Sequence, residues 1–403
     1  MFDKRTRLYT NFNYQHFFYL IKSFFTKKKN FTEFLSKFLN VKNIHLTSQG
    51  RVALFDIVNL IIEKTGKKIF YISPFTLPEV IYSIQYAGGN VVFLDIDKST
   101  GLINENKLEK KIHTESAAVI ITHLYSNTDQ IKNFINRFKG KIKIIEDTAI
   151  NFGAKIDGKS MGTLADYGFF SFNIVKILST LNGGLIYISN DDDFKYYKST
   201  VKKKNFPQIN TIKLIFTAVV LKILFNNFFY QLSHYFLKYV YKNNIKFVLK
   251  NIYPILYNEY KDKTPDHYYY DFNWTMNDVG VFGLKTIEEV ISFRKHKARL
   301  YERYLDQDKI KYFKFYGGEN IFLDFPIIIK TKTNKYVYET LFLHGYDIKR
   351  IWYSNNARIS ADYNSNDFLD TEFLEQHILC LPTHNNINEK DIINICKLIN
   401  KTL

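Results

Sequence analysis

A single lysine, Lys176, stands in the otherwise apolar stretch 174–178 and is followed by the pair Gly183-Gly184 and an apolar run. Burial among apolar neighbours lowers the pKa of an amine, and an uncharged amine can condense with an aldehyde to form an imine. A lone lysine is more often a solvated side chain whose stem rests on apolar surface. The apolar surroundings make Lys176 the first candidate for covalent chemistry.

Two further segments offer the groups that an aldehyde cofactor with a ring nitrogen and a phosphate would need. Residues 144–147, Ile-Ile-Glu-Asp, predict a strand that ends in carboxylates, and a carboxylate can keep a ring nitrogen protonated. Residues 48–54 form a turn through Gly50 that leads into an apolar helix, whose first N–H groups suit a phosphate. Each segment also has a purely structural explanation, as a helix cap or ion-pair partner and as a plain helix start.

Alternating apolar and amphipathic segments between about 47 and 189 predict the elements that position these groups. Strands are expected at 69–72, 91–94, 117–121, 142–145 and 185–188, and helices at 78–86 and 129–138. Strands separated by helices form right-handed crossovers and a buried, mostly parallel sheet. Ligands of such sheets bind beyond the carboxyl ends of the strands, which is where Asp147 stands.

The predicted fold class is α/β, in three parts. Residues 1–200 form a large domain that includes an N-terminal segment and the sheet. Residues 201–262 form a basic, aromatic-rich helical insert. Residues 263–403 contain a linking helix and a small C-terminal α/β domain. Within this last part we expect one long helix over 277–304, a strand at 322–329 and helices at 335–343 and 389–400.

Composition places the protein in a reducing compartment. The 403 residues include only two cysteines, too few for a disulfide framework, and the N-terminus lacks the continuous apolar core of a secretory signal. We therefore expect a cytoplasmic protein, and we predict no metal site. The net charge is +17, and its distribution along the chain is uneven.

The insert carries much of this charge. No Asp or Glu occurs from 194 to 258, whereas eleven lysines do. Four of these lysines recur at every fourth position: Lys238, Lys242, Lys246 and Lys250. Such a stripe repels itself on a helix unless an anionic surface offsets it. Apolar contact would come from Tyr241, Ile245, Val248 and Ile252.

We interpret the insert as one or two amphipathic helices on an anionic membrane surface, assisted by the aromatic and basic stretch 17–29. The longest lysine-free run, 223–237, is too short and too polar for a transmembrane helix. The alternative is a helical cap that packs on the enzyme or on its dimer partner. No nucleic acid is expected as a partner, because no recognised binding module accompanies the charge.

Taken together, these segments resemble the sugar aminotransferase family named after DegT, DnrJ, EryC1 and StrS, a branch of the fold-type I enzymes that use pyridoxal phosphate (PLP). The resemblance covers roughly 40–200 and 265–403. Matching segments are 48–54, 73–97, 122–126, 146–149 with 153–154, 162–166, 171–176 with 183–184, and 272–276. The aspartate and lysine motifs, with Asp147 and Lys176 29 positions apart, are the most specific of these.

The resemblance implies a role for each matching residue. Lys176 would form the Schiff base and shuttle protons, and Asp147 would pair with the pyridine nitrogen. The phosphate would be bound by the Ser171 side chain and by backbone amides near Gly50, Arg51 and Val52. Asn273 would reach the phosphate from the second subunit, which implies a homodimer with shared active sites.

This chain departs from the family pattern at three positions near the expected cofactor. Leu77 stands where an aromatic residue often stacks on the ring, and Ile150 where a glutamine contacts the ring hydroxyl. Phe152 replaces a usual histidine. A further departure is Arg51, where a threonine is common, although arginine occurs in some relatives. The resemblance implies that these departures make the cofactor's surroundings more apolar than usual. Some relatives carry histidine in place of the lysine and dehydrate their substrate, and Lys176 disfavours that reaction here.

The resemblance implies transfer of an amino group, from glutamate, to a keto-sugar in surface polysaccharide or lipopolysaccharide biosynthesis. The sugar would be nucleotide-linked, or lipid-linked if the insert binds a membrane and the enzyme is peripheral at its inner face. Two alternatives stay open: other PLP chemistry on a lipid or amino-acid substrate, and a membrane-associated scaffold without catalysis. His123 and His384 are each explained as neighbours of the substrate or as structural histidines.

Overall fold

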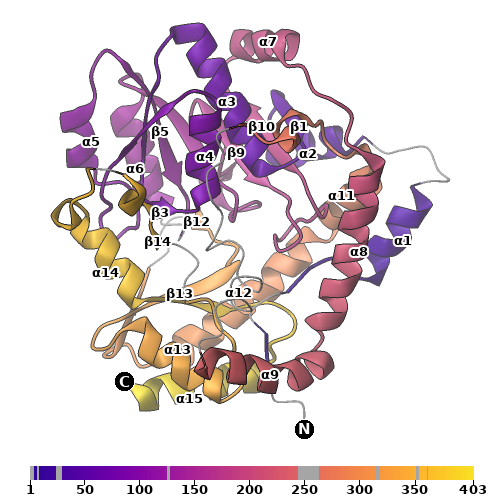
Figure 1. The fold of residues 1–403 in the computed structure, drawn as a ribbon, viewed down its shortest axis with the longest axis vertical. Helices are drawn as coiled ribbons and strands as arrows, with labels where there is room; N and C mark the ends of the chain where they lie inside the picture. Colours follow the sequence, from indigo (N-terminus) through magenta and orange to yellow (C-terminus); the bar gives the residue numbers. More distant parts are fainter. Residues whose placement is uncertain are drawn as a thin grey trace.

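The computed structural model describes residues 4–6, 9–23, 30–124, 128–243, 263–313, 318–350, 354–360 and 362–403. A large α/β part and a smaller one lie one above the other in Figure 1, and two long helices of the insert run along one side and under the smaller part. The predicted fold class is confirmed in its elements. The exact division at residues 200 and 262 stays a prediction.

A seven-stranded sheet forms the centre of the large part. Its order is β1 (Ile44–Thr47), β10 (Gly184–Ile188), β9 (Tyr167–Ser171), β6 (Lys143–Asp147), β5 (Ser116–Thr122), β2 (Ile69–Ile72) and β4 (Asn90–Phe93). The β4, β2, β5, β6 and β9 strands pair in parallel, and β10 runs antiparallel to both of its neighbours. The mostly parallel sheet is therefore confirmed, with β10 as the exception.

Both faces of this sheet are covered, because alternate residues of each strand enter different cores. In β5, Val119 and Ile121 join one apolar cluster, whereas Ala118 and Ile120 join the cluster under α3 (Gly50–Thr65). The remaining large-part helices are α1 (Tyr14–Lys22), α2 (Phe31–Leu39), α4 (Pro78–Tyr86), α5 (Glu105–Lys111), α6 (Thr128–Phe138) and α7 (Asp191–Thr200). The α3 helix is apolar on most sides because it packs on α4 and on β1, β9 and β10.

The small part has its own core around an antiparallel sheet. The strands β11 (Ile310–Tyr312), β13 (Asp324–Ile329) and β15 (Ile378–Pro382) pair side by side, and α13 (Asn334–Leu343), α14 (Leu369–His377) and α15 (Glu389–Thr402) pack around them. The expected strand at 322–329 thus begins two residues later. The two parts also touch through the short strands β3 (Phe75–Thr76) and β14 (Ser354–Asn355).

The expectation of one helix over 277–304 is wrong. The structure has α11 (Asn277–Lys285) and α12 (Ile287–Tyr304), which meet at Thr286. The Thr286 hydroxyl donates to the carbonyls of Phe282 and Gly283 at 3.4 and 3.3 Å, a local bond that competes with the regular helical pattern. The break separates a buried helix packed on α1 and α2 from a helix with a charged outer face.

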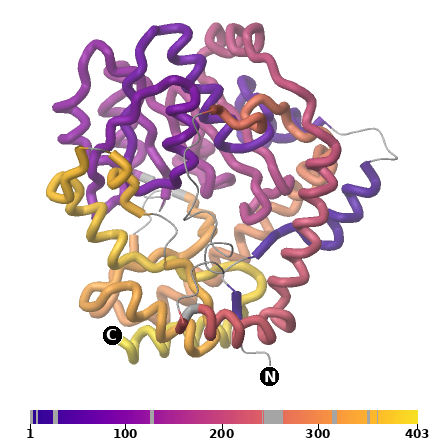
Figure 2. The backbone as a smooth tube through the Cα atoms, in the orientation of Figure 1, coloured from indigo at the N-terminus to yellow at the C-terminus, as the bar shows by residue number. Residues whose placement is uncertain are grey.

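The insert contains two helices, α8 (Gln208–Leu224) and α9 (Asn227–Lys242), bent by 80° at the break between them. The chain leaves α7, descends along α8 and turns into α9 under the small part (Figure 2). Lys246 and Lys250 of the predicted lysine stripe, and the apolar residues 245, 248 and 252, lie outside the described residues. Within the described part of the chain, no single helix is long and apolar enough to cross a bilayer, although α8 and α9 pass that test as a bent pair.

A buried ion pair ties the start of the insert to the large part. The Lys203 ammonium donates to the Asp56 carboxylate of α3 at 2.6 Å and to the Tyr268 carbonyl at 2.8 Å. Burial raises the pKa of Asp56 to about 6, and the Lys203 charge and the Tyr197 hydroxyl act in the opposite direction. Because both partners are nearly inaccessible to water, either one left alone would be a buried, uncompensated charge.

We predict that Lys203→Met lowers the free energy of unfolding by about 3–5 kcal/mol. This is the cost of leaving the Asp56 carboxylate buried without its partner charge. Adding Asp56→Asn to the same chain should recover most of that loss, since no charge then remains unpaired. Urea unfolding at pH 7 of the wild type, both single variants and the double variant measures the coupling. Strictly additive losses would contradict a direct pairing.

Candidate functional site

The predicted site residues converge at the carboxyl edge of the parallel strands. Asp147 is the last residue of β6 and Ser171 the last residue of β9, and these strands are neighbours in the sheet. Gly50 is the first residue of α3, and Lys176 lies in the turn between β9 and β10. One edge of the sheet therefore carries the amine, the carboxylate, the hydroxyl and the helix start.

Lys176 and Asp147 are both buried, and each changes the proton affinity of the other. Burial lowers the pKa of Lys176 to about 8, whereas the Asp147 carboxylate raises it. Burial raises the pKa of Asp147 to about 6, against the N–H of Ala149 and the charge of Lys176. At neutral pH the carboxylate is thus mostly ionised, and a minor but usable fraction of the amine is neutral.

The small part contributes a second pair of charges to the field at Lys176. The Lys349 ammonium lies 2.6 Å from the Asp324 carboxylate at the start of β13. Lys349 lowers and Asp324 raises the pKa of Lys176. No pattern in the sequence indicates this pair, because the two residues are 25 positions apart and lie in a different part of the chain from the lysine motif.

Backbones approach closely on the side of the candidate site where the sequence predicts a phosphate. A Cβ atom at Gly50 would lie 2.9 Å from the Ser171 Cβ, and one at Gly184 would collide with the Gln49 carbonyl oxygen. The first turn of α3 therefore sits directly against the ends of β9 and β10, where only glycine fits. Gln49, the N-cap residue, makes no side-chain capping bond, so the helix start keeps its capacity for an anion.

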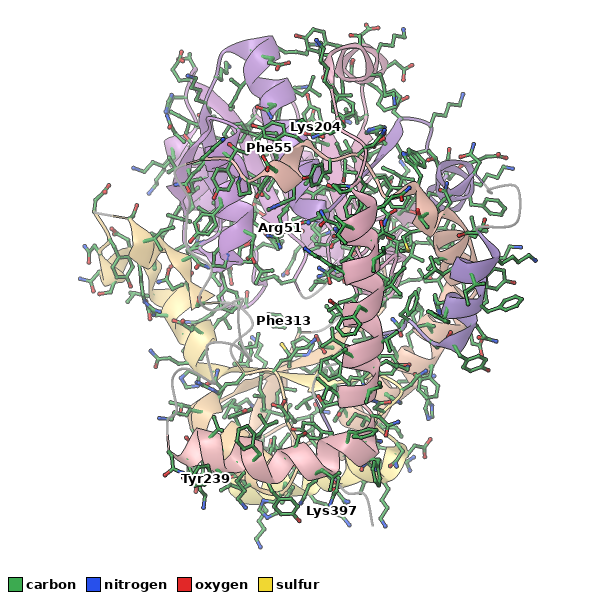
Figure 3. All side chains as sticks on the ribbon, turned by 45° about the vertical axis from the view of Figure 1, so that its right-hand side comes forward. Arg51, Phe55, Lys204, Tyr239, Phe313 and Lys397 are labelled. Carbon is green, nitrogen blue, oxygen red and sulfur yellow. The ribbon has the colours of Figure 1, made fainter. Side chains whose placement is uncertain are left out.

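The three predicted backbone donors are not equivalent. The Val52 N–H donates to the Gln49 carbonyl at 3.1 Å, inside the helix. The amides of Gly50 and Arg51 stand closer to the free end of the helix and are the better candidates for an anion. The Arg51 guanidinium points toward Glu79 of α4, 3.7 Å away, and Figure 3 shows Arg51 at the edge of the large part that faces the small one.

Glu146 has a structural role that the sequence analysis missed. Its carboxylate accepts the backbone N–H groups of Gly162, Leu164 and Ala165 at 2.6–2.9 Å. It thereby fixes the turn 162–165 behind β6, which explains why a glycine-containing segment accompanies the aspartate. Burial raises the pKa of Glu146 to about 7. The two adjacent carboxylates at the end of β6 thus have different roles. Glu146 accepts the N–H groups of the turn, and Asp147 interacts with the charge of Lys176.

Asn11, in the N-terminal segment, was also missed. Its side-chain amide donates to the carbonyls of Lys176 and Ile177 at 3.0 and 2.9 Å. Two bonds from one side chain fix the backbone at Lys176 and Ile177, and they link the N-terminal segment to the lysine turn. No pattern in the sequence around Asn11 could have indicated this contact across 165 positions.

The residues that depart from the family pattern occupy two different places. Leu77 and Ile150 pack at the edge of one apolar cluster that also contains Phe75, Leu124 and Phe313 of the small part. Phe152 is buried in the core of the large part, where its ring contacts Phe38, Phe170 and Phe172. Leu77 and Ile150 can therefore shape an apolar wall between the two parts, whereas Phe152 fills the core.

Asn273 is buried, and its amide donates to the Thr211 hydroxyl of α8 at 3.0 Å. Within one chain it thus contacts the insert rather than the phosphate side of the site. Whether it serves a second subunit stays a prediction. The contact shows that α8 packs directly on the segment that the resemblance assigns to the shared site.

The two histidines are buried, and the choice between a substrate neighbour and a structural histidine stays a prediction. His123 is fully buried beside Glu146, and burial lowers the pKa of its ring to about 3, so the pair is not an ion pair at neutral pH. Its carbonyl accepts the side-chain amide of Asn151. The His384 ring stacks on Tyr9 with centroids 5.2 Å apart, and burial lowers its pKa as well.

We predict that Lys176→Met stabilises the protein without cofactor at pH 7 by about 2–3 kcal/mol. The wild type buries an amine whose pKa is lowered from 10.5 to about 8, so its charge costs stability below pH 8. That cost falls as the pH rises from 8 to 10.5, where the folded protein has released a proton that the unfolded chain still binds. Denaturation curves of both proteins at pH 7 and pH 10 test this. An equal difference at both pH values would contradict it.

We predict that Gly50→Ala weakens binding of a phosphate-bearing cofactor at least about tenfold, or about 1.4 kcal/mol. The added methyl group would force the start of α3 away from Ser171. Ser171→Ala is the matched variant, because it removes one hydroxyl without moving the helix. Fluorescence titration with the cofactor measures both. Wild-type affinity in Gly50→Ala would show that the helix start does not form the phosphate site.

Residues 21–206, a little under half of the chain, match the sequence model of the DegT/DnrJ/EryC1/StrS aminotransferase family. The chain is 31% identical over 179 residues to the dTDP-4-amino-4,6-dideoxy-D-glucose transaminase of Shigella dysenteriae, covering 44% of this chain and 47% of that one. It is 29% identical over 174 residues to the UDP-4-amino-4,6-dideoxy-N-acetyl-beta-L-altrosamine transaminase of Campylobacter jejuni, covering 41% and 44%. The aligned stretch thus spans less than half the length of these relatives.

The likeness in fold extends over the whole chain. The Escherichia coli GDP-4-keto-6-deoxy-D-mannose-3-dehydratase, solved with bound hydrated PLP, superposes with a TM-score of 0.71 over 98% of this chain and 99% of that one, at 16% identity. The predicted fold type is therefore confirmed for both parts. Residues 21–206 are thus similar in sequence to the DegT/DnrJ/EryC1/StrS aminotransferase family, and the fold of the whole chain agrees with that similarity.

Proposed function

We propose that this protein is a PLP-dependent aminotransferase that moves an amino group from glutamate to a nucleotide-linked keto-sugar in surface polysaccharide or lipopolysaccharide biosynthesis. The observation that carries the proposal is the buried Lys176 amine beside the Asp147 carboxylate, at the edge of the sheet where Ser171 and the start of α3 meet. The match of residues 21–206 to the family model and the similarity to two nucleotide-sugar transaminases support the substrate class.

The residues present fit PLP in each of its parts. Lys176 offers an amine for the aldehyde, Asp147 a carboxylate for the ring nitrogen, and Ser171 with the start of α3 an anion site. When bound, PLP acts as an electron sink for the bond that is broken at the amino-bearing carbon. Leu77 and Ile150 supply apolar surface on the side of the small part.

The protein's own groups divide the work of proton transfer. The Lys176 Nζ, with a pKa of about 8, can release and regain a proton close to physiological pH, as a general acid and base must. Asp147 stays ionised above its pKa of about 6, so it can stabilise a positive charge on the ring nitrogen. Asn11 fixes the backbone of the lysine turn and so limits the positions that Nζ can reach.

A homodimer with shared active sites is part of this proposal. It rests on the family resemblance of residues 272–276, which places Asn273 at the phosphate of the partner's site. Since the Asn273 amide here donates to Thr211, that role requires either a second acceptor or a change of partner on dimerisation. The insert helix α8 would then lie next to the dimer interface.

The test is an absorbance spectrum of the purified protein with PLP, before and after glutamate. We expect a band near roughly 410–430 nm in the wild type and none in Lys176→Ala, because the band reports the lysine-bound cofactor. Glutamate should shift the band to shorter wavelength, and a nucleotide-linked keto-sugar should restore it. Asp147→Asn should keep the band but lose most of the glutamate response, and the pH midpoint of its formation should fall, because Asp147 raises the pKa of Lys176.

The outcomes separate the competing functions. The absence of a band in the wild type would contradict the cofactor assignment. A band that ignores glutamate would indicate different PLP chemistry, on a lipid or amino-acid substrate. A cellular role that survives Lys176→Ala unchanged would favour a membrane-associated scaffold.

A further inference from the structure

The outer face of α8 is an exposed apolar stripe. Its members are spaced three and four residues apart, which puts them on one side of the helix: Ile209, Ile212, Phe216, Val219 and Ile223. Their side chains are 42–69% exposed. A helix that rests on a protein core normally turns such a stripe inward, and here a separate set of residues faces the core.

The α9 helix repeats this arrangement at 80° to α8. Its outward residues include Phe228, Leu232, Tyr235, Phe236 and Tyr239, which are 47–65% exposed. Of the 25 large apolar side chains that are exposed in the described part of the chain, twelve lie on these two helices, so the exposure is concentrated and not scattered. In Figure 3 both helices run along the front of the molecule, with Tyr239 at its lower edge.

The inner faces of both helices pack against the rest of the enzyme. On α8, Thr211 and Ala218 are buried, and Thr211 accepts the Asn273 amide. On α9, Tyr230, His234 and Val240 are buried, and the His234 ring packs on Phe342 of α13 with centroids 5.0 Å apart. These contacts anchor each helix to the enzyme at several points. Helices held in this way are unsuited to crossing a bilayer as the bent pair that their composition alone would permit.

The charge of this surface indicates what kind of partner can bind it. The segment 194–258 contains no acidic residue, and Lys213 and Lys242 are exposed on α8 and α9. Figure 3 places Lys397 of α15 at the same lower edge. A second copy of the same surface would bring lysines against lysines, with no carboxylate on either helix to offset them. At an anionic lipid surface, the apolar stripe can enter the boundary of the acyl chains, and the lysines can interact with negatively charged headgroups.

We propose that the outer faces of α8 and α9 form a docking surface for an anionic membrane, on which the protein lies as a peripheral, non-spanning enzyme. Aromatic and aliphatic side chains of the two stripes enter the headgroup boundary, and the flanking lysines contact lipid phosphates. Because the Thr211 hydroxyl of α8 accepts the Asn273 amide, Asn273 lies one helix away from the lipid in the docked protein. The inference uses only the insert and is independent of the reaction proposed above.

The experiment is sedimentation of the full-length protein with sucrose-loaded vesicles of phosphatidylcholine, with or without about 30% phosphatidylglycerol. We expect binding at least about tenfold tighter to the anionic vesicles, weakened by added salt. Phe216→Ser with Leu232→Ser should reduce that binding about tenfold or more. Lys213→Gln with Lys242→Gln should reduce it about fivefold per lysine at low salt.

The controls match each change at a distant exposed position. Ile359→Ser with Leu369→Ser removes apolar surface that is 54% and 62% exposed, and Lys110→Gln with Lys111→Gln removes two exposed charges on α5. Both should bind vesicles like the wild type. The far-ultraviolet circular dichroism spectrum of every variant, recorded in the same preparations without cofactor, shows that each has folded and keeps this test separate from that of the reaction.

Two results would overturn the proposal. In the first, the stripe variants sediment with anionic vesicles as well as the wild type does. In the second, the wild type ignores vesicles, and Phe216→Ser with Leu232→Ser instead lowers the molecular mass measured by light scattering without lipid. That second result would show that the stripe is an interface between copies of this chain.

Discussion

The rest of the site depends on one constraint: an amine has to be kept out of water and yet be able to carry a proton. Burial alone would make the Lys176 charge too costly, and full exposure would leave its pKa near 10.5, too high for proton transfer at neutral pH. The Asp147 carboxylate sets the balance, and the result is a pKa of about 8. Several nearby contacts hold this pair in place. Glu146 accepts backbone N–H groups of the turn 162–165, and Asn11 donates two hydrogen bonds to the lysine turn.

Much of the architecture could be predicted from the sequence, because the local pattern and the final structure agree. Continuous apolar runs bounded by polar residues became β2, β5 and β6, and the amphipathic stretches between them became α4 and α6. The long helix over 277–304 failed for a local reason, since Thr286 offers its hydroxyl to carbonyls one turn back. Periodicity does not register such a bond, because a threonine on the polar side of a helix fits the pattern equally well.

The site was predictable only where residue type and neighbours both carry chemical meaning. Lys176 in an apolar stretch and Asp147 at the end of a strand have such meaning, and the structure brings both to one edge of the sheet. Lys349, Asp324 and Asn11 were missed, since each acts through contacts between segments far apart in the sequence. The replacement at Phe152 was interpreted as part of the cofactor's surroundings, but its ring fills the core beside Phe38 and Phe172.

The α8 helix has a consequence for how this chain can vary. One side must keep Thr211 and Ala218 in register with the body of the enzyme, and the opposite side repeats apolar residues at intervals of three and four. A one-residue insertion or deletion would rotate the helix by about 100° and mismatch both sides at once. The α8 helix is therefore not a detachable addition, because its register is tied to the enzyme through Thr211 and Ala218.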